Sequence, residues 1–375
     1  MGNILSDSMT KTYNVPNFEL HERLDSCTVE ILPHSFKILF DCVLKMESTF
    51  EVILNTQLKQ KDPKEAISIA ISARALFDME EEHELFLTEG EEEFVSHQIT
   101  NENIPLKEGI VAPFVKLSCK LHRRPVASHS AIQMVNNKLL ARDPEEKQLF
   151  EIILLSTHSA EGGVRIINSV NHYDLEISKF CFLGGKDPAK YLHSEDVKLF
   201  LSACETSVCN ALKKDIPAAL VIQQKSQIKE SHLKVAFDGD SVLFSDETDT
   251  VFHEKGLDEV IKYEKDMEHV PIGEGPMKKF AMILGEMKKK FSPENDPICT
   301  YLVTARSGNK LGIRAIKTLR SWGLKIDEAF FMAGSPKGPL LAHIQPHIFF
   351  DDNARNIKGA REYGIPAAFV PCGCE

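Results

Sequence analysis

The sequence predicts an α/β protein made of two tandem domains with mostly parallel sheets. Apolar runs typical of buried strands end in acidic or hydroxyl side chains, as is usual at the functional edge of an open α/β sheet. The length of 375 residues suits two domains of ordinary size. A repeat at a constant offset relates the two halves of the chain, which favours two copies of one fold.

The first of these strands is the apolar run Leu233–Phe237, which is followed by Asp238-Gly239-Asp240. Side chains alternate along a strand, so carboxylates at positions i and i+2 can face one reactive centre. Two unpaired acids would repel each other and resist burial. The pair therefore predicts a bound cation, for which Mg²⁺ is the best match.

Two further strands and one loop carry the other reactive side chains of the second half. Tyr301–Thr304 ends in a hydroxyl, and His347–Phe350 runs directly into Asp351 and Asp352. Lys337 lies in a segment too rich in Gly and Pro for the interior of a helix. At the carboxyl edge of one parallel sheet, these side chains would meet the two acids of the first strand.

Each of these side chain types has a role in phosphoryl transfer. A carboxylate can attack phosphorus and form an aspartyl-phosphate. A second acid can protonate the leaving alcohol and later activate water. Hydroxyl and ammonium groups hold phosphate oxygens, while a metal ion neutralises the developing charge. The set therefore indicates phosphoryl transfer.

Several segments resemble the cytosolic 5′-nucleotidase type I family, within the haloacid-dehalogenase-like phosphatase superfamily. The resemblance covers roughly residues 65–373 and leaves residues 1–60 unmatched. It implies two Rossmann-like domains of the haloacid-dehalogenase type, the second with a small helical cap. The segments that carry the resemblance are Ser72–Phe77, Ile167–Leu175, Val235–Glu247, Tyr301–Ser307, Thr318–Leu324, Pro336–Leu340 and Pro346–Asp352.

This resemblance implies a Mg²⁺-dependent 5′-nucleotidase that hydrolyses nucleoside 5′-monophosphates, AMP foremost, through an aspartyl-phosphate. Asp238 would attack phosphorus and also bind the metal ion. Asp240 would act as general acid and then as base, and would bind Mg²⁺ through its backbone carbonyl. Asp351 and Asp352 would complete the metal site, with either one as the direct ligand.

The same resemblance places Thr304 and Lys337 against the phosphate, where they offset the charge on Asp238. Arg306 is either a further phosphate contact or a solvent-facing residue. Activation by ADP and a homo-oligomeric assembly are implied by the resemblance alone. Two alternatives stay open: a phosphatase of the same mechanism acting on another small phosphate ester, and a non-catalytic nucleotide-sensing or scaffold protein.

The internal repeat has an offset of 149 residues (312 − 163 = 149) and extends over some fifty positions. It pairs Gly163–Ile167 with Gly312–Ile316, and Ile216–Ala219 with Ile365–Ala368. A constant register over this length is hard to obtain by chance between unrelated segments. The two halves are therefore predicted to share one fold.

The reactive acids are not repeated in the first half. Ser72 and Arg74 take the places of the first two acids, and Ser202 and Ala203 take the places of the second pair. Ser156 retains the hydroxyl at the end of the middle strand. A metal ion would lack its carboxylates there, so the first half is predicted to be a degenerate copy. It is either a scaffold or a site that binds a nucleotide without hydrolysing it.

The predicted organisation is an N-terminal extension (residues 1–60), a degenerate haloacid-dehalogenase-like domain (61–228) and a catalytic haloacid-dehalogenase-like domain (229–375). Within the last, a charged and helix-prone interval of about 248–297 would form the cap. By the resemblance, the cap closes over the substrate and excludes water.

Composition and the first residues bear on location and partners. A net charge of −11 argues against nucleic-acid binding, and no apolar run approaches the length of a membrane span. The nine cysteines show no disulfide or zinc spacing, which suits a reducing cytoplasm. Gly2 and Ser6 fit the pattern for N-myristoylation at Gly2, with a disordered amino terminus as the alternative. One acyl chain would give at most weak membrane association.

Overall fold

The computed structural model describes residues 66–115, 131–143, 145–146, 149–175, 177, 179–223 and 232–372. All of them belong to one compact unit, residues 61–375. The predictions for residues 1–60, including the lipidation of Gly2, lie outside the described residues.

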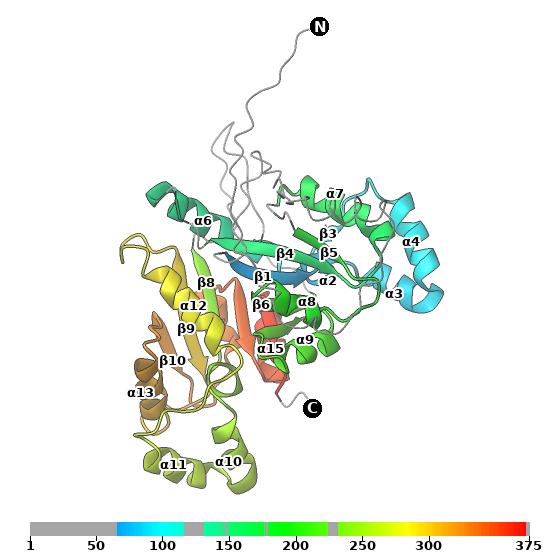
Figure 1. Cartoon of the computed structure of the whole chain (residues 1–375). Coiled ribbons are helices and arrows are strands. Elements are labelled where there is room, and N and C mark those ends of the chain that lie inside the picture. The colour runs from blue at the N-terminus through cyan, green and yellow to red at the C-terminus, as the bar shows by residue number, and fades with distance from the viewer. Residues whose placement is uncertain are drawn as a thin grey trace, which may run out of the picture. The chain divides into compact units, whose positions relative to one another are not determined.

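The described residues form twelve strands. They are β1 (Ile67–Ser72), β2 (Phe77–Asp78), β3 (Lys107–Glu108), β4 (Phe150–Ser156), β5 (Lys179–Phe182), β6 (Val197–Ser202), β7 (Ala218–Val221), β8 (Leu233–Phe237), β9 (Ile298–Thr304), β10 (Glu328–Phe331), β11 (Ile348–Asp351) and β12 (Ala367–Phe369). Ten of them make one sheet in the order β10-β9-β8-β11-β12-β7-β6-β1-β4-β5, and β2 pairs with β3 (Figure 1). The central strands are buried apolar runs, as expected where helices cover both faces of a sheet.

The ten strands fall into two halves of five with the same internal order. β1 lies between β4 and β6, and β8 lies between β9 and β11, all in parallel. The registers agree as well, because Ile71 pairs with Leu154 on β4 just as Phe237 pairs with Leu302 on β9. The strand order therefore carries the repeat that the sequence predicts.

The halves join through the antiparallel pair β7 and β12, the one antiparallel contact among the described strands of the large sheet. Leu220 pairs with Phe369 across this contact. These two residues are equivalent under the repeat (369 − 220 = 149). The two halves are thus related by a local two-fold rotation between β7 and β12.

Helices cover both faces of the sheet (Figure 1). The covering helices are α6 (Ala131–Arg142), α7 (Val164–His172), α8 (Ala189–Ser194), α9 (Glu205–Leu212), α12 (Lys278–Lys288), α13 (Gly312–Trp322), α14 (Gly338–Ile344) and α15 (Ala354–Glu362). The remaining described helices are α2 (Ala73–Leu76), α3 (Glu80–Glu89), α4 (Glu91–Thr100), α5 (Ala112–Val115), α10 (Glu247–Lys255) and α11 (Leu257–Asp266), with short turns η1 (Ala160–Gly163) and η2 (Gly239–Leu243).

Apolar packing differs between the two faces. On one face a single cluster of buried side chains runs through both halves, including Ile69 of β1 and Phe237 of β8. On the other face each half has its own cluster, one containing Phe200 and the other containing Phe349. Phe200 and Phe349 are equivalent under the repeat (349 − 200 = 149). The shared cluster and the shared sheet explain why residues 61–375 pack as one unit.

The predicted α/β fold with a mostly parallel sheet is confirmed. The division into domains of residues 61–228 and 229–375 stays a prediction, because strands of both halves share one sheet. The cap at about 248–297 also stays a prediction. In that interval α10 and α11 lie beyond the end of the sheet in Figure 1, whereas α12 packs into the core through Phe280 and Leu284.

In the part of the chain that the structure describes, the helices are too short or too polar to span a membrane.

Candidate active site

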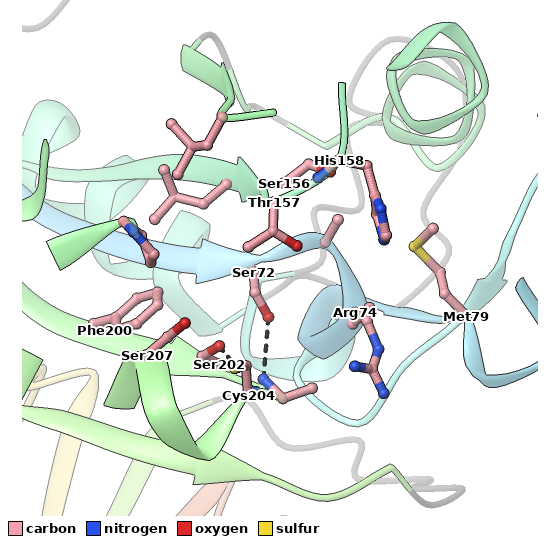
Figure 2. Close-up of a pocket in the computed structure, with 15 residues that line it drawn as sticks. Ser72, Arg74, Met79, Ser156, Thr157, His158, Phe200, Ser202, Cys204 and Ser207 are labelled. Atoms are coloured by element: carbon pink, nitrogen blue, oxygen red, sulfur yellow. Dashed lines mark hydrogen bonds between the residues drawn. The ribbon is translucent and has the colours of Figure 1, made fainter. Parts of the chain in front are cut away.

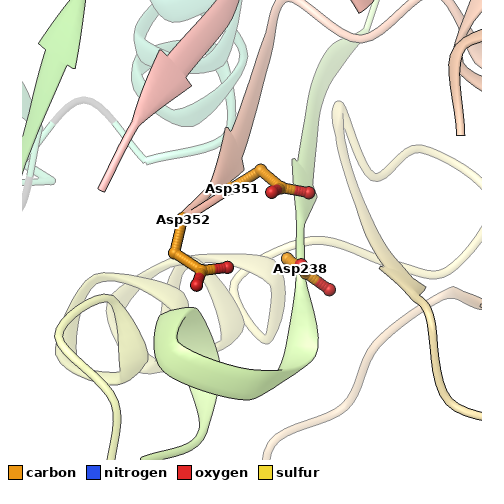
Figure 3. A group of neighbouring side chains, drawn as sticks. All are labelled: Asp238, Asp351 and Asp352. Atoms are coloured by element: carbon orange, nitrogen blue, oxygen red, sulfur yellow. The ribbon is translucent and has the colours of Figure 1, made fainter. Parts of the chain in front are cut away.

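Three carboxylates meet at the carboxyl ends of β8 and β11 (Figure 3). Asp238 follows β8, Asp351 ends β11, and Asp352 comes next in the chain. The two strands are neighbours in the sheet, and one carboxylate oxygen from each acid lies within 4.8 Å of the others. Asp238 and Asp351 are buried and Asp352 is half-buried. The structure thus brings together three of the four acids that the sequence predicts as metal ligands.

A buried lysine lies between two of these acids. The Nζ atom of Lys337 is 2.6 Å from Oδ2 of Asp238 and 2.7 Å from Oδ2 of Asp351. Lys337 immediately precedes α14 and is only 2% exposed. Burial alone would lower the pKa of Lys337, but the charges of Asp238 and Asp351 outweigh it and raise that pKa. The lysine therefore stays charged and neutralises part of the acidic cluster.

Burial and neighbouring negative charges raise the pKa of two acids of the cluster, Asp238 and Asp352. Burial, and next the charge of Asp351, raise the pKa of Asp238 in spite of Lys337. Burial also raises the pKa of Asp352 to about 6, with further contributions from Asp238 and Asp249. A cation bound among these acids would favour their charged forms, and carboxylate oxygens suit a hard ion such as Mg²⁺. Asp238, Asp351 and Asp352 therefore fit a divalent metal ion.

Hydrogen bonds fix the position of Asp351. The backbone N–H of Asn353 donates to Oδ1 of Asp351 at 2.7 Å. The Nδ2 atom of Asn356, in the first turn of α15, donates to Oδ1 at 3.2 Å and to Oδ2 at 3.1 Å. Sequence reasoning missed Asn356, whose one signal is an amide placed shortly after the acidic pair.

The end of β9 lies directly against the residue that follows Asp238. Thr304 is fully buried, and its Oγ1 accepts a hydrogen bond from the backbone N–H of Arg306 at 3.2 Å. A Cβ atom at Gly239 would lie 3.0 Å from Oγ1 and 3.2 Å from Cβ of Thr304. This is tighter than ordinary contacts, so glycine between the two acids allows the close approach of Thr304.

Asp240 lies outside the three-acid cluster, in an ion pair with Arg306. Arg306 donates from Nε to Oδ2 of Asp240 at 2.9 Å and from Nη2 to Oδ1 at 2.6 Å. Its Nη1 donates to Glu264 at 2.8 Å. Burial alone would lower the pKa of Arg306, but Asp240 and Glu264 outweigh it and raise that pKa. Arg306 is thus buried rather than solvent-facing, and its contact with a phosphate stays a prediction.

Buried ionic groups also link the site to α10 and α11. Glu264 of α11 is 2% exposed and accepts hydrogen bonds from Thr248 at 2.8 Å and from Arg314 at 3.2 Å. Thr248 in turn accepts a hydrogen bond from Arg306 at 2.8 Å. Sequence reasoning missed Glu264. Glu264 lies four residues after Val260, and residues four apart share one face of a helix, so this spacing was the available signal that Glu264 faces the interior.

Asp249 of α10 is a further acid that sequence reasoning missed. Its Oδ2 accepts a hydrogen bond from the hydroxyl of Ser241 at 3.0 Å. Burial, and next the charge of Asp240, raise the pKa of Asp249. Ser241 has a φ of 60°, in the left-handed region that non-glycine residues seldom adopt. No feature of the sequence separates Asp249 from the acids around it.

Comparisons with known proteins agree with this site. A sequence model of the 5′-nucleotidase family matches residues 59–375, which include every residue of the site. The chain is 44% identical over 313 residues to cytosolic 5′-nucleotidase 1B of Homo sapiens. That match covers 82% of this chain and 49% of the relative, so the chain spans about half the length of the curated relative that it matches. These matches confirm the resemblance seen in the motifs.

Arg306→Ala should lower the free energy of unfolding by about 3–5 kcal/mol, because it leaves Asp240 without its buried partner and removes one of the two buried arginines that pair with Glu264. Urea denaturation measures this change. Arg320→Ala is the matched control, since Arg320 is exposed on α13 and should change stability by less than about 0.5 kcal/mol. Equal effects of the two substitutions would contradict a stabilising role for the buried pairs.

Mg²⁺ should raise the melting temperature more at about pH 7.5 than at about pH 5. The pKa of Asp352 is raised from 3.8 to about 6, so its ionisation destabilises the metal-free protein as pH rises between these values. At about pH 7.5 Asp352 is ionised and a bound cation offsets that loss, whereas at about pH 5 Asp352 is largely protonated and protons compete with the cation. Thermal melts of the wild-type chain with and without Mg²⁺ test this. The exposed Asp258→Asn is the control and should keep the rise in melting temperature that Mg²⁺ causes, whereas Asp352→Asn should reduce that rise. An equal shift in both variants would contradict metal binding at the cluster.

Proposed function

The chain belongs to the 5′-nucleotidase family, and we propose that it hydrolyses nucleoside 5′-monophosphates to a nucleoside and phosphate. One observation carries this proposal: Lys337 bridges the buried acids Asp238 and Asp351 at the carboxyl edge of the sheet. This arrangement offers a nucleophile, a cation for phosphate oxygens and ligands for a metal ion in one place.

In the first step, a carboxylate oxygen of Asp238 attacks phosphorus, and the bond from phosphorus to the 5′ oxygen of the nucleoside breaks. The product on the protein is an aspartyl-phosphate at Asp238. Lys337 and the hydroxyl of Thr304 hold the phosphate oxygens during this attack. The contact of 2.6 Å between Lys337 and Asp238, and the place of Thr304 at the end of the adjacent strand, support these roles.

Asp240 gives a proton to the departing 5′ oxygen and, in the second step, takes a proton from the water that attacks the aspartyl-phosphate. This attack breaks the bond from phosphorus to the oxygen of Asp238, which restores the carboxylate and releases phosphate. The ion pair with Arg306 holds the carboxylate of Asp240 in one position beside the site. In this proposal Arg306 orients Asp240. A direct contact with the phosphate would require Arg306 to leave one of its carboxylate partners.

Asp238, Asp351 and Asp352 would hold Mg²⁺, together with the backbone carbonyl of Asp240. When bound, the ion would offset the negative charge of the phosphate and of the acids. Helices α10 and α11, tied to the site through Glu264, would form the cap that excludes water.

The finer assignments are part of the same proposal. AMP is the favoured substrate, ADP an activator and a homo-oligomer the assembly, all by family resemblance. A cytoplasmic location is supported by the name of the human relative, which is described as cytosolic.

Asp238→Asn should lower the rate of phosphate release from AMP by at least about 10³-fold, because the amide is not a nucleophile. Asp258→Asn, an exposed change on α11, should leave the rate near that of the wild type. Phosphate release by the folded proteins measures both. Activity of Asp238→Asn close to that of Asp258→Asn would overturn the assignment of the nucleophile.

EDTA should abolish phosphate release, and Mg²⁺ should restore it. Ca²⁺ should restore it poorly, because Ca²⁺ prefers a larger and looser oxygen shell.

The same assay with AMP and with a sugar phosphate tests the substrate class, and kcat/KM should be higher for AMP. Full activity in EDTA would contradict the metal role, and a higher kcat/KM for the sugar phosphate would contradict the substrate.

A further inference from the structure

A pocket in the first half lies at the place equivalent to the acidic site of the second half (Figure 2). Ser72, Ser156 and Ser202 line it, at the carboxyl ends of β1, β4 and β6. These three strands have the same order and register as the strands that carry the acidic site. The pocket is therefore the second copy of one site geometry.

The backbone around the pocket repeats the hydrogen bonds of the acidic site. The N–H of Cys204 donates to Oγ of Ser202 at 3.1 Å. In the other half, the N–H of Asn353 donates to Oδ1 of Asp351 at 2.7 Å. Both pairs are equivalent under the repeat (351 − 202 = 149). The loop has kept its shape although its acid has become a hydroxyl.

The three serine hydroxyls can donate hydrogen bonds to a ligand. Oγ of Ser72 accepts from the N–H groups of Ala75 and Ala203, both at 3.2 Å; Figure 2 marks the second of these bonds with a dashed line. Oγ of Ser156 accepts from the N–H of His158 at 3.3 Å, much as Ser202 is bound. A hydroxyl has one proton and two lone pairs, so Ser72 has both lone pairs used and Ser156 and Ser202 have one used each, and the proton of each hydroxyl can be donated to a ligand.

The charge of the pocket is opposite to that of the acidic site. Arg74 stands where the second half has Asp240, and Pro188 stands where it has Lys337 (337 − 188 = 149). The residues that line the pocket include Arg74 and His158 but no acidic side chain. A cavity of this composition suits an anion and lacks the carboxylates that a metal ion needs.

Arg74 and His158 have donors left for a ligand. Arg74 is 20% exposed at its side chain, and its Nη2 pairs with Glu80 on α3 at 3.0 Å. Its Nε is buried and has no hydrogen-bond partner among the described residues. The ring of His158 stacks on that of Phe94, with 4.1 Å between the ring centroids. Burial lowers the pKa of His158 to about 4. His158 is thus neutral near pH 7 and offers one N–H donor.

We propose that this pocket binds a phosphate dianion, free or as the end of a phosphate ester, without a metal ion. Arg74 supplies the charge, while Ser72, Ser156, Ser202 and His158 supply neutral donors. A planar guanidinium and several hydroxyls are a common way to hold phosphate oxygens. Binding of phosphate at this pocket does not require the hydrolysis that is proposed for the acidic site of the second half.

Binding of inorganic phosphate to the full chain in EDTA tests the proposal. Calorimetry should detect one site, and Arg74→Ala should weaken binding by about 10- to 100-fold, as expected for a lost charge-assisted hydrogen bond. Arg142→Ala is the matched control, because Arg142 is exposed at the end of α6 and does not line the pocket. No binding in the wild type, or equal affinities in the two variants, would overturn the proposal.

AMP and adenosine separate the sources of the phosphate. Tighter binding of AMP than of inorganic phosphate would assign a phosphate ester, and equal binding would assign the free anion. Adenosine should not compete in either case, and competition as strong as that of AMP would overturn recognition through phosphate. EDTA suppresses turnover, so these outcomes do not depend on the proposed hydrolysis.

Cys204 provides a second readout that does not require a folded Arg74→Ala variant. Cys204 is exposed, has a free thiol and lines the pocket. Inorganic phosphate should slow the alkylation of Cys204 by iodoacetamide in the wild-type chain, as followed by peptide mass spectrometry. The milder Arg74→Gln should remove this protection, whereas Arg142→Ala should keep it. Alkylation of wild-type Cys204 at the same rate with and without phosphate would contradict occupation of the pocket.

Discussion

The buried contact of Lys337 with Asp238 and Asp351 is the constraint on which the rest of the second half depends. Two carboxylates at adjacent strand ends would repel each other in a buried setting, and one ammonium group between them reduces that cost. For the ammonium group to reach both, β8 and β11 must be neighbours, and the loop before α14 must place the lysine over their ends. The charge balance of the site thus depends on the order of the strands in the sheet.

Comparison of the halves separates what the fold needs from what the chemistry needs. Phe200 and Phe349 occupy equivalent positions in equivalent apolar clusters, so packing is retained in both copies. The charged groups are not retained: Ser202 replaces Asp351, and Pro188 replaces Lys337. The scaffold therefore tolerates a change of charge at the strand ends, because an acid and a hydroxyl can each accept the hydrogen bond from the backbone N–H of the loop.

The sequence was sufficient to predict features that depend on strand ends. Asp238, Asp351 and Lys337 were expected to meet because carboxyl ends of parallel strands share one edge. Contacts that depend on how a helix is placed could not be predicted, and the pairing of Arg306 with Glu264 on α11 is the clearest case. The sequence alone does not distinguish a buried glutamate such as Glu264 from an exposed one. The join of both halves into one sheet was also missed, because a short antiparallel pair between Leu220 and Phe369 leaves no pattern in the sequence.

In the proposed mechanism, Asp238 is the nucleophile that carries the phosphate between substrate and water. Acid quenching of the enzyme during turnover of phosphorus-labelled AMP, followed by mass spectrometry of the peptides, tests this claim most directly. Label is expected on the peptide that contains Asp238, and Asp238→Asn should lose that label. Release of labelled phosphate with no label on the protein at any time, or label on a different residue, would contradict it.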